Sequence, residues 1–516
     1  MMPLAGQQVL VLGLGASGLA MARWCARRGA RVAVWDSRDA PPQAAALREQ
    51  VPDAEIRGGA LDAQALSGVQ LLLKSPGLGP NDPRIAGTLQ AAGAAGVPVA
   101  GELELFVQAL AHLRDERGYA PQVLAVTGTN GKTTTTALAA LLVERAGRSV
   151  VAAGNIGPTM LDTLMSVLDD GGELPQVWVL ELSSFQLDGV RDFEPSAATV
   201  LNLTQDHLDW HGDMAAYAAA KARVFGARTV AVINRDDPLV EAMVNVPAPV
   251  PLAARGKARG ARPVKRTVVR FGLRSPAAAG DYGVATEGGM AWLVRALPDE
   301  TEPKRRKEGE PAAEIHLQRL MPADALRLRG RHNAANALAA LALATAIGCP
   351  LAPMLHGLRE YAGEPHRVQP VGRVGDVEAF DDSKGTNVGA TVAALEGLGD
   401  DRAPARLVVI LGGDGKGQDF APLAEPVARH ARAVALIGRD APAIEQALAA
   451  AGVPLQRHAD LQQAVRWSFA QARAGDAVLL SPACASFDMF RDYGHRAEVF
   501  VQAVHELAAE RGEVSA

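Results

Sequence analysis

The chain is poor in cysteine. It contains three cysteines, Cys25, Cys349 and Cys484, among 516 residues. An odd number of widely separated cysteines excludes a disulfide framework, and no two of them have the spacing of zinc ligands. The sequence therefore fits a reducing compartment, and a buried thiol is the expected role of Cys484.

The chain also lacks an excess of positive charge and a long apolar run. It carries 52 Lys and Arg against 57 Asp and Glu, whereas a nucleic-acid-binding protein usually has a basic excess. No uninterrupted apolar stretch reaches the ~18 residues of a membrane span. Residues 1–8 hold no Lys or Arg of the kind that opens a secretory signal. We expect a cytoplasmic protein with no membrane span and no nucleic-acid partner.

The length predicts several domains. At ~150 residues per domain, 516 residues suggest about three. Short apolar runs alternate with segments of helical periodicity, and 52 Gly and 32 Pro residues fall between them. This alternation predicts an α/β fold with parallel sheets.

The apolar pattern predicts three α/β segments in succession. Strands are expected at 9–12, 31–36, 71–73, 98–100, 123–126, 177–182, 198–203, 230–233, 407–411, 433–437 and 477–480. Helices are expected at 19–28, from about 102, and at 133–146, 215–225 and 333–347. The pattern weakens at 254–325, where two charged stretches predict solvated loops around short strands.

A glycine motif at 13–18, Gly-Leu-Gly-Ala-Ser-Gly, follows the first strand and opens a helix. Free N–H groups at such a helix start bind a diphosphate, and Asp36 ends the next strand, where a carboxylate meets a ribose hydroxyl. The pattern leaves three alternatives open: NAD(P) or FAD, another diphosphate ligand such as a nucleotide-sugar, or a tight turn with no ligand.

A second glycine motif, Val-Thr-Gly-Thr-Asn-Gly-Lys-Thr-Thr at 126–134, lies between a strand and a helix. Its amides are suited to cradle phosphates, Lys132 to reach the β- and γ-phosphates, and Thr133 to hold Mg²⁺. Valine stands at 126 where the common phosphate loop begins with glycine. The alternative is a glycine-rich turn with a surface lysine.

Several polar residues follow predicted strands. Glu181 ends a strand beside the second glycine motif, where an acid suits Mg²⁺, and His207 lies in the cluster 206–209. Asn333 and Asn336 share one face of a helix start, where capping is the alternative role. Further polar clusters stand at 365–367, 381–387, 411–416 and 481–486. By pattern alone, Lys221 is a solvated helical lysine.

Taken together and in order, these motifs resemble the Mur ligase family over nearly the whole chain. The loop at 128–133 is similar to the family's ATP loop, which explains the valine at 126. The segments 181–187 and 381–387 are the most specific to one member of the family. The segment 381–387 resembles members that add D-glutamate to UDP-N-acetylmuramoyl-L-alanine, rather than those that add L-alanine, a diamino acid or a dipeptide.

The resemblance implies three domains. They are a Rossmann-like UDP-binding domain at 1–117, a central P-loop ATPase-like domain with a parallel sheet at 118–329, and a Rossmann-like amino-acid-binding domain at 330–516. The charged region at 255–314 is longer than the resemblance leads us to expect.

The resemblance also implies roles for individual residues. The UDP-substrate set is Gly15, Ala16, Ser17, Asp36, Ser37, Arg38, Ser75, Pro76, Gly77, Asn155 and Ser183. The ATP set is Gly128, Thr129, Asn130, Gly131, Lys132, Thr133, Thr134, Asn333, Asn336, Arg367 and Asp382. The D-glutamate set is Lys384, Thr386, Lys416, Ser486 and Tyr493, the last at a position where the family more often has Phe.

By the same resemblance, two Mg²⁺ sites would use Thr133, Glu181, His207 and a carbamylated Lys221. Lys132, His207, Lys221, His366 and Arg367 would carry the catalysis, through an acyl phosphate made from ATP and attacked by the D-glutamate amine. The sequence does not identify the base for that amine. A monomer is expected.

Three other hypotheses fit part of the sequence. A nicotinamide-dependent oxidoreductase uses the first glycine motif but leaves the second unexplained. A nucleotide-dependent switch protein leaves the C-terminal Lys, Thr and Ser residues unexplained. A folylpoly-γ-glutamate synthetase shares the ATP loop but has no added N-terminal UDP domain.

Overall fold

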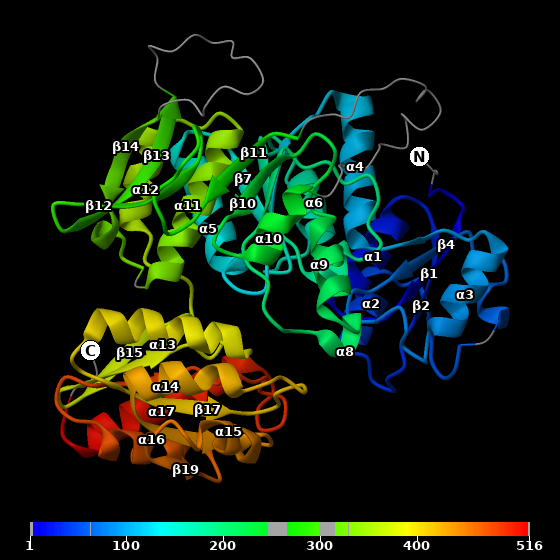
Figure 1. The fold of residues 1–516 in the computed structure, drawn as a ribbon. Coiled ribbons are helices and arrows are strands. Elements are labelled where there is room, and N and C mark those ends of the chain that lie inside the picture. Colours follow the sequence, from blue (N-terminus) through cyan, green and yellow to red (C-terminus); the bar gives the residue numbers. More distant parts are fainter. Residues whose placement is uncertain (1–3, 62, 246–265, 299–314, 329, 514–516) are drawn as a thin grey trace.

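The computed structural model describes residues 4–61, 63–245, 266–298, 315–328 and 330–513. Three α/β units follow one another along the chain, and in the view of Figure 1 the first lies to the right of the second and the third lies below it. This confirms the predicted fold class. Of the helices in these described parts, none is both long and apolar enough to cross a membrane.

The first unit is a five-stranded parallel sheet in the order β3-β2-β1-β4-β5. Its strands are β1 (Gln8–Leu12), β2 (Arg31–Trp35), β3 (Glu55–Arg57), β4 (Leu71–Lys74) and β5 (Val99–Ala100). Its helices are α1 (Ala16–Arg27), α2 (Ala44–Gln50), α3 (Ala86–Ala95) and α4 (Glu102–Arg117).

The second unit is built on a six-stranded parallel sheet in the order β11-β10-β9-β6-β8-β7. The strands are β6 (Gln122–Thr127), β7 (Val150–Gly154), β8 (Val177–Glu181), β9 (Ala197–Val200), β10 (Val230–Asn234) and β11 (Val268–Phe271). The helices are α5 (Lys132–Arg145), α6 (Met160–Asp169), α7 (Ser184–Leu187), α8 (Leu208–His211), α9 (Met214–Ala222) and α10 (Pro238–Ala242).

The second unit also carries a small antiparallel sheet where loops around short strands were expected. It consists of β12 (Tyr282–Glu287), β13 (Met290–Pro298) and β14 (Ile315–Pro322), and β13 is nine residues long. Polar and apolar residues mix along β14 because an antiparallel sheet can keep one face in water, which weakens the apolar signal. The predicted loops at 255–265 and 299–314 lie outside the described residues.

The third unit is a six-stranded sheet in the order β15-β16-β20-β17-β18-β19, antiparallel only between β15 and β16. Its strands are β15 (Gln369–Val374), β16 (Val377–Asp381), β17 (Leu407–Gly412), β18 (Ala431–Ile437), β19 (Leu455–Arg457) and β20 (Ala477–Leu480). Its helices are α13 (Val388–Arg402), α14 (Ala424–His430), α15 (Ala441–Leu448), α16 (Leu461–Gln471) and α17 (Tyr493–Glu510).

Two helices fall on the other side of the domain boundary predicted at 329/330. Helices α11 (Arg331–Ala346) and α12 (Leu351–Glu360) pack into the same apolar cluster as β6, β8 and α5. The alanine-rich sequence of α11 allows this close packing against the central sheet. By packing, the third unit therefore begins near β15, later than the sequence-based division placed it.

The three units are joined in two different ways. One continuous apolar cluster runs from α1 and α4 of the first unit to α6 and β8 of the second, with Phe106 edge-on to Trp178 at 4.9 Å. The apolar clusters of the third unit contain, among the described residues, only side chains of that unit. The first two units thus share a core, whereas polar contacts join the third.

A buried arginine holds the segment that follows β16. Arg496 of α17 is fully buried, and its guanidinium donates to Ser383 Oγ at 2.9 Å, Ser383 O at 2.7 Å and Cys484 O at 3.1 Å. Burial lowers the pKa of this guanidinium to about 10. The arginine fixes two loops that leave neighbouring strands, β16 and β20, which carry predicted site residues.

We expect Arg496→Met to lower the free energy of unfolding of the third unit by about 3 kcal/mol or more, because three buried acceptors lose a charged donor. Hydrogen exchange of the β16 and β20 amides measures this local stability. Arg491→Met is the control, because Arg491 is exposed and its ion pair with Glu498 is long, at 3.8 Å. Equal protection in the two variants would contradict the role of Arg496.

Candidate functional site

A cavity of about 410 Å³ opens at the carboxyl ends of β1, β2 and β4 in the first unit. Ligands of parallel sheets bind at this end. Nine of the predicted UDP-set residues line it together: Gly15, Ala16, Ser17, Asp36, Ser37, Arg38, Ser75, Pro76 and Gly77. The segments 15–17, 36–38 and 75–77, which are about twenty and forty residues apart in the sequence, therefore line the same cavity.

The glycine motif makes this cavity possible by letting α1 start close to β1. A Cβ on Gly18 would lie 1.9 Å from the carbonyl oxygen of Gly13, so no larger residue fits. The N-cap, Gly15, offers no capping side chain, which leaves the first N–H groups of α1 free for an anion.

Asp36 organises the loop instead of presenting a free carboxylate. Its oxygens accept from Leu14 N at 2.7 Å and from Arg38 Nε and Nη2 at 2.8 and 2.7 Å. The Arg38 guanidinium, bonded to this carboxylate, is the main cause that lowers the pKa of Asp36 to about 2. Asp36 is thus ionised at neutral pH and already paired.

Arg84 also lines the cavity, and the motif analysis missed it. Its Nη1 donates to Ser37 Oγ at 2.9 Å, and its guanidinium pairs with Asp82. It comes from the loop between β4 and α3, far in sequence from the glycine motif. No sequence motif marks it.

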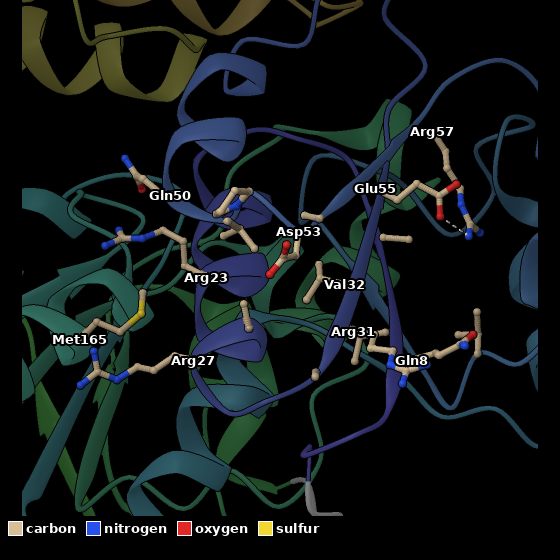
Figure 2. Close-up of a pocket in the computed structure, with 18 of the residues that line it drawn as sticks. Gln8, Arg23, Arg27, Arg31, Val32, Gln50, Asp53, Glu55, Arg57 and Met165 are labelled. Atoms are coloured by element: carbon tan, nitrogen blue, oxygen red, sulfur yellow. Dashed lines mark hydrogen bonds and ion pairs between the residues drawn. The ribbon is translucent and has the colours of Figure 1, made fainter.

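A second cavity, of about 720 Å³, lies beside α1 and the first residues of β1 and β2 (Figure 2). Figure 2 shows Arg23, Arg27 and Met165 on one side of it. Arg23 and Arg27 are paired with Asp162 and Asp169 of α6 at 2.5 and 2.6 Å, so they join two units. None of the predicted site residues lines this cavity.

The loop at 128–134 has the geometry of a phosphate-binding loop. Gly131 caps α5 with a φ of +82°, and a Cβ there would lie 2.6 Å from Asn336 Oδ1, so glycine is required. Lys132 folds back and donates to the carbonyl oxygens of Gly128 and Thr129 at 3.0 and 2.8 Å. The lysine is therefore not a surface side chain.

Lys221 reaches the same loop from α9. It is 1% exposed, and its Nζ donates to Gly128 O at 2.9 Å and to Thr127 Oγ1 at 3.3 Å. Burial, and then the charge of Lys132, hold the pKa of Lys221 well below its usual value. The solvated position that the pattern alone suggested is therefore wrong.

Glu181 ends β8 next to this loop. Its Oε1 accepts from Asn155 Nδ2 at 2.8 Å, whereas its buried Oε2 has no hydrogen-bond partner among the described residues. Ser183, two residues on, caps α7 through Gln186. An orphaned carboxylate oxygen beside a phosphate loop fits a hard cation such as Mg²⁺.

His207 and Asp206 stand on the loop after β9. Burial lowers the pKa of His207 to about 4, so the ring is neutral at pH 7 and keeps a nitrogen lone pair. Within the described ranges no group of three or more His, Cys, Asp and Glu residues has metal-site geometry.

The two asparagines of α11 lie beside the loop. Asn336 Nδ2 donates to Asn333 Oδ1 at 3.1 Å, and Asn336 is the neighbour that constrains Gly131. Gly330 is the N-cap of this helix. Helix capping, the alternative role, therefore does not explain the pair.

Residues of the third unit close over the phosphate loop. Arg367 Nη2 donates to Thr133 Oγ1 at 2.9 Å. The amides of Asn130 and Asn387 exchange hydrogen bonds at 3.0 and 3.2 Å. Lys416 Nζ lies 4.0 Å from Asp206, and these contacts link loops more than two hundred residues apart.

The remaining predicted residues gather on the third unit. Lys384 Nζ lies 3.3 Å from Tyr493 Oη and 4.9 Å from its ring, and the His366 ring lies 6.0 Å from the same ring. His366 Nδ1 is 2.6 Å from Asp381 Oδ2.

Three further residues of this group stand in neighbouring loops. Thr386 N donates to Lys384 O at 2.9 Å, and Ser486 is buried next to the loop that Arg496 holds. Asp382 accepts from Ser481 Oγ at 2.6 Å, and burial raises the pKa of Asp382 to about 7. Cys484 is buried with a free thiol, as the sequence predicted.

We expect Asn387→Asp to open the contact between the second and third units. The new carboxylate still accepts from Ala390 N and so keeps the cap of α13. It can no longer donate to Asn130, and it repels the carboxylate of Asp206, whose Oδ2 lies 3.4 Å from Asn387 Nδ2 in the unmodified protein. Small-angle scattering measures the opening as a larger radius of gyration, with helix content unchanged. An unchanged radius would show that these amides do not hold the closed arrangement.

Three family models match this chain in order. They are the Mur ligase MurD-like N-terminal domain at 7–101, the Mur ligase middle domain at 126–270 and the Mur ligase glutamate ligase domain at 366–484. The start of the third match agrees with the boundary that packing gives.

Individual proteins agree with these matches. The UDP-N-acetylmuramoylalanine–D-glutamate ligase of Albidiferax ferrireducens is 61% identical over 99% of this chain and 98% of its own length. The ligase of the same name from Burkholderia mallei is 59% identical over 98% of each chain. The crystal structure of MurF ligase from Thermotoga maritima in complex with ADP has a TM-score of 0.56 at 16% identity, covering 99% of this chain and 100% of that one. This chain belongs to the Mur ligase family.

Proposed function

We propose that the protein joins D-glutamate to UDP-N-acetylmuramoyl-L-alanine at the expense of ATP, as a step in building the precursor of peptidoglycan. The observation that carries the proposal is the 59–61% identity, over almost the whole chain, to ligases of that name. The hydrogen bonds that the third unit makes to the phosphate loop of the second unit support it.

The rival hypotheses leave observations unexplained. In an oxidoreductase the Asp36 carboxylate would be free for a ribose, but it is taken by Arg38 and the Leu14 amide. A nucleotide switch would not need Arg367 and Asn387 to reach the loop from another unit. A folylpoly-γ-glutamate synthetase would not need the 410 Å³ cavity of the first unit.

In the proposed reaction the first unit holds the UDP end of the substrate. The free amides of α1 receive the diphosphate, with Arg38 and Arg84 at the cavity rim. The sugar and the L-alanyl arm then extend toward Asn155, Ser183 and the phosphate loop. This places the terminal carboxylate where it meets the γ-phosphate of ATP.

The phosphate loop would hold ATP with its γ-phosphate between two units. Lys132 and Arg367 neutralise charge on the transferred phosphoryl group, and Asn336 and Asn333 hold the adenine end. A carboxylate oxygen of the substrate attacks phosphorus, ADP leaves, and an acyl phosphate forms. Mg²⁺, which Thr133, Glu181 and His207 would hold, supplies charge neutralisation when bound.

The third unit would supply D-glutamate to this acyl phosphate. Lys384, Lys416, Thr386 and Ser486 bind its two carboxylates, and Tyr493 packs against it. The neutral amine attacks the acyl carbon to give a tetrahedral intermediate. As the intermediate collapses, the bond from carbon to the phosphate oxygen breaks, and the surplus proton of the amine passes to the departing phosphate, which is released as HPO₄²⁻. His366, which is held by Asp381 beside Tyr493, would lie near the reacting groups.

Lys221 would act as a carbamate. A lowered pKa increases the share of the neutral amine, which is the form that attacks CO₂. The C–N bond forms, the proton leaves to solvent, and the cation becomes an anionic oxygen ligand suited to Mg²⁺. We further propose that the protein acts as a monomer in the cytoplasm, where its free cysteines stay reduced.

The test of the function is phosphate release from ATP with Mg²⁺ and UDP-N-acetylmuramoyl-L-alanine, comparing D-glutamate, L-glutamate, L-alanine and meso-diaminopimelate. We expect release with D-glutamate alone, and a loss of at least ~10²-fold in Lys132→Ala, the scale of removing one transition-state donor. Phosphate release with a different amino acid would mean that the protein is a ligase for that amino acid and not for D-glutamate. Silence with all four would refute the ligase proposal.

We expect Lys221→Ala to lose activity and to regain part of it with a small carboxylate that replaces the carbamate oxygens. Labelled bicarbonate should give a carbamate ¹³C resonance in the unmodified protein and none in the variant. Lys384→Ala is the control that keeps the resonance, because its lysine lies on the third unit. Full activity in Lys221→Ala would remove the carbamate role.

A further inference from the structure

His366 and Asp381 form a hydrogen-bonded pair at the carboxyl end of β16. Asp381 is the last residue of that strand, and its side chain is 1% exposed, whereas the His366 side chain is 32% exposed. The Nδ1 atom of His366 lies 2.6 Å from Asp381 Oδ2. The other carboxylate oxygen, Oδ1, accepts from Ser383 N at 2.9 Å. Both oxygens of this buried carboxylate are therefore engaged, and its position is fixed.

The pairing determines which nitrogen of the ring can accept a proton. A carboxylate beside Nδ1 keeps a hydrogen on that nitrogen, because a lone pair there would face a negative oxygen. The lone pair of the neutral ring is then on Nε2. The ring also lines two cavities beside α17, of about 600 and 640 Å³. His366 and Asp381 thus have the arrangement of a general base, with a buried orienting carboxylate and a ring that solvent can reach.

His366 lies between the residues that would hold the two reacting groups. Its chain neighbour Arg367 donates to Thr133 of the phosphate loop at 2.9 Å. The carbonyl oxygen of His366 accepts from Lys384 N at 3.3 Å, and its ring lies 6.0 Å from the ring of Tyr493. In the proposed reaction the first contact marks the place of the acyl phosphate, and the other two mark the place of D-glutamate. The amine has to lie between these places, because it joins the bound glutamate to the acyl carbon.

The reaction needs a proton acceptor at this point. The amine of free D-glutamate is protonated at neutral pH, and an ammonium group has no lone pair with which to attack an acyl carbon. One proton must therefore leave the nitrogen before the attack. A second proton leaves afterwards, and that is the one that passes to the departing phosphate.

We propose that His366 is the general base that takes the first proton, on Nε2, and that Asp381 is the positioning residue that keeps the ring in the accepting tautomer. The inference rests on the proposed function, because it names the proton acceptor of that reaction. The N–H bond of the ammonium breaks, its electron pair stays on nitrogen as the nucleophile, and the proton binds Nε2. Asp381 offsets the charge of the imidazolium until the proton passes to solvent through the cavities beside α17.

Asp381→Asn separates the tautomer of the ring from the shape of the site. The new amide oxygen still accepts from Ser383 N, so the amide NH₂ faces His366 Nδ1 and donates to it. The ring then carries its hydrogen on Nε2 and cannot accept a proton there. We expect kcat with D-glutamate to fall at least ~10²-fold, within the range of losing general-base catalysis. The KM values for ATP and for UDP-N-acetylmuramoyl-L-alanine should stay unchanged.

Hydroxylamine gives a readout that damage to the site would not produce. It is largely unprotonated at neutral pH, so it attacks an acyl phosphate without a base and yields a hydroxamate and phosphate. Hydroxamate formation from ATP and UDP-N-acetylmuramoyl-L-alanine should be as fast in Asp381→Asn and His366→Gln as in the unmodified protein. His505→Gln is the matched control, because His505 lines the same two cavities but lies beside Val371 O, at 3.2 Å. It should keep full activity with both nucleophiles.

The outcomes separate a base from a structural role. Equal losses with D-glutamate and hydroxylamine would overturn the inference, because a site that fails with both has lost formation of the acyl phosphate. Full activity with D-glutamate in either variant would overturn it as well. An unmodified protein that makes no product with either nucleophile would refute the proposed function, and the role of His366 with it.

The ¹⁵N resonances of the His366 ring test the pair without any substrate. We expect a neutral ring with its hydrogen on Nδ1 in the unmodified protein and on Nε2 in Asp381→Asn. A hydrogen on Nε2 in the unmodified protein would contradict the positioning role of Asp381, whatever the protein catalyses.

Discussion

Two buried lysines share one carbonyl oxygen, and the site depends on that arrangement. Lys132 and Lys221 both donate to Gly128 O, at 3.0 and 2.9 Å, from helices on different sides of the loop. Burial, and after it the charge of Lys132, lowers the pKa of Lys221. Burial is also the main cause that lowers the pKa of Lys132, and the charges of Arg367 and Lys384 add to it. Negative charge beside these two ammonium groups would relieve the repulsion, which supports the phosphate at Lys132 and the carbamate at Lys221 that we propose. The negative charges of Glu181 and Asp206 act in the opposite direction and raise the pKa of Lys132.

The three units are joined by two kinds of contact. The first two share an apolar core through α4 and α6, which fixes the substrate cavity relative to the phosphate loop. The third is attached by polar contacts such as Arg367 to Thr133 and Asn387 to Asn130, each of which is worth little and re-forms readily in water. An apolar interface between the first two units and a polar interface with the third suit an enzyme that must admit its substrates before the third unit closes.

Much of the fold was readable from the sequence because parallel strands buried on both faces appear as short apolar runs. The strands β1, β6, β8, β17 and β20 were predicted within one or two residues for this reason. The antiparallel β12–β14 sheet gave no such signal, since one face meets water. The sequence placed helices α11 and α12 with the third unit, whereas their apolar residues pack into the cluster of β6, β8 and α5. Helical periodicity shows that a face is buried and not which sheet buries it.

The sequence by itself determined which residues are chemically equipped: the two glycine loops, Glu181 at a strand end, and the polar clusters at 365–367 and 381–387. Local rules suffice there, because a helix start or a strand end is set by a few neighbouring residues. Only the tertiary structure decided which of them meet. Lys221 looks solvated as a sequence pattern and is buried against Gly128, Arg84 carries no motif and lines the cavity, and Arg496 holds the 381–387 segment from a helix over a hundred residues away. Burial depends on how the whole chain packs. A pKa that burial shifts, or a polar atom that burial leaves unpaired, therefore cannot be predicted from the sequence alone.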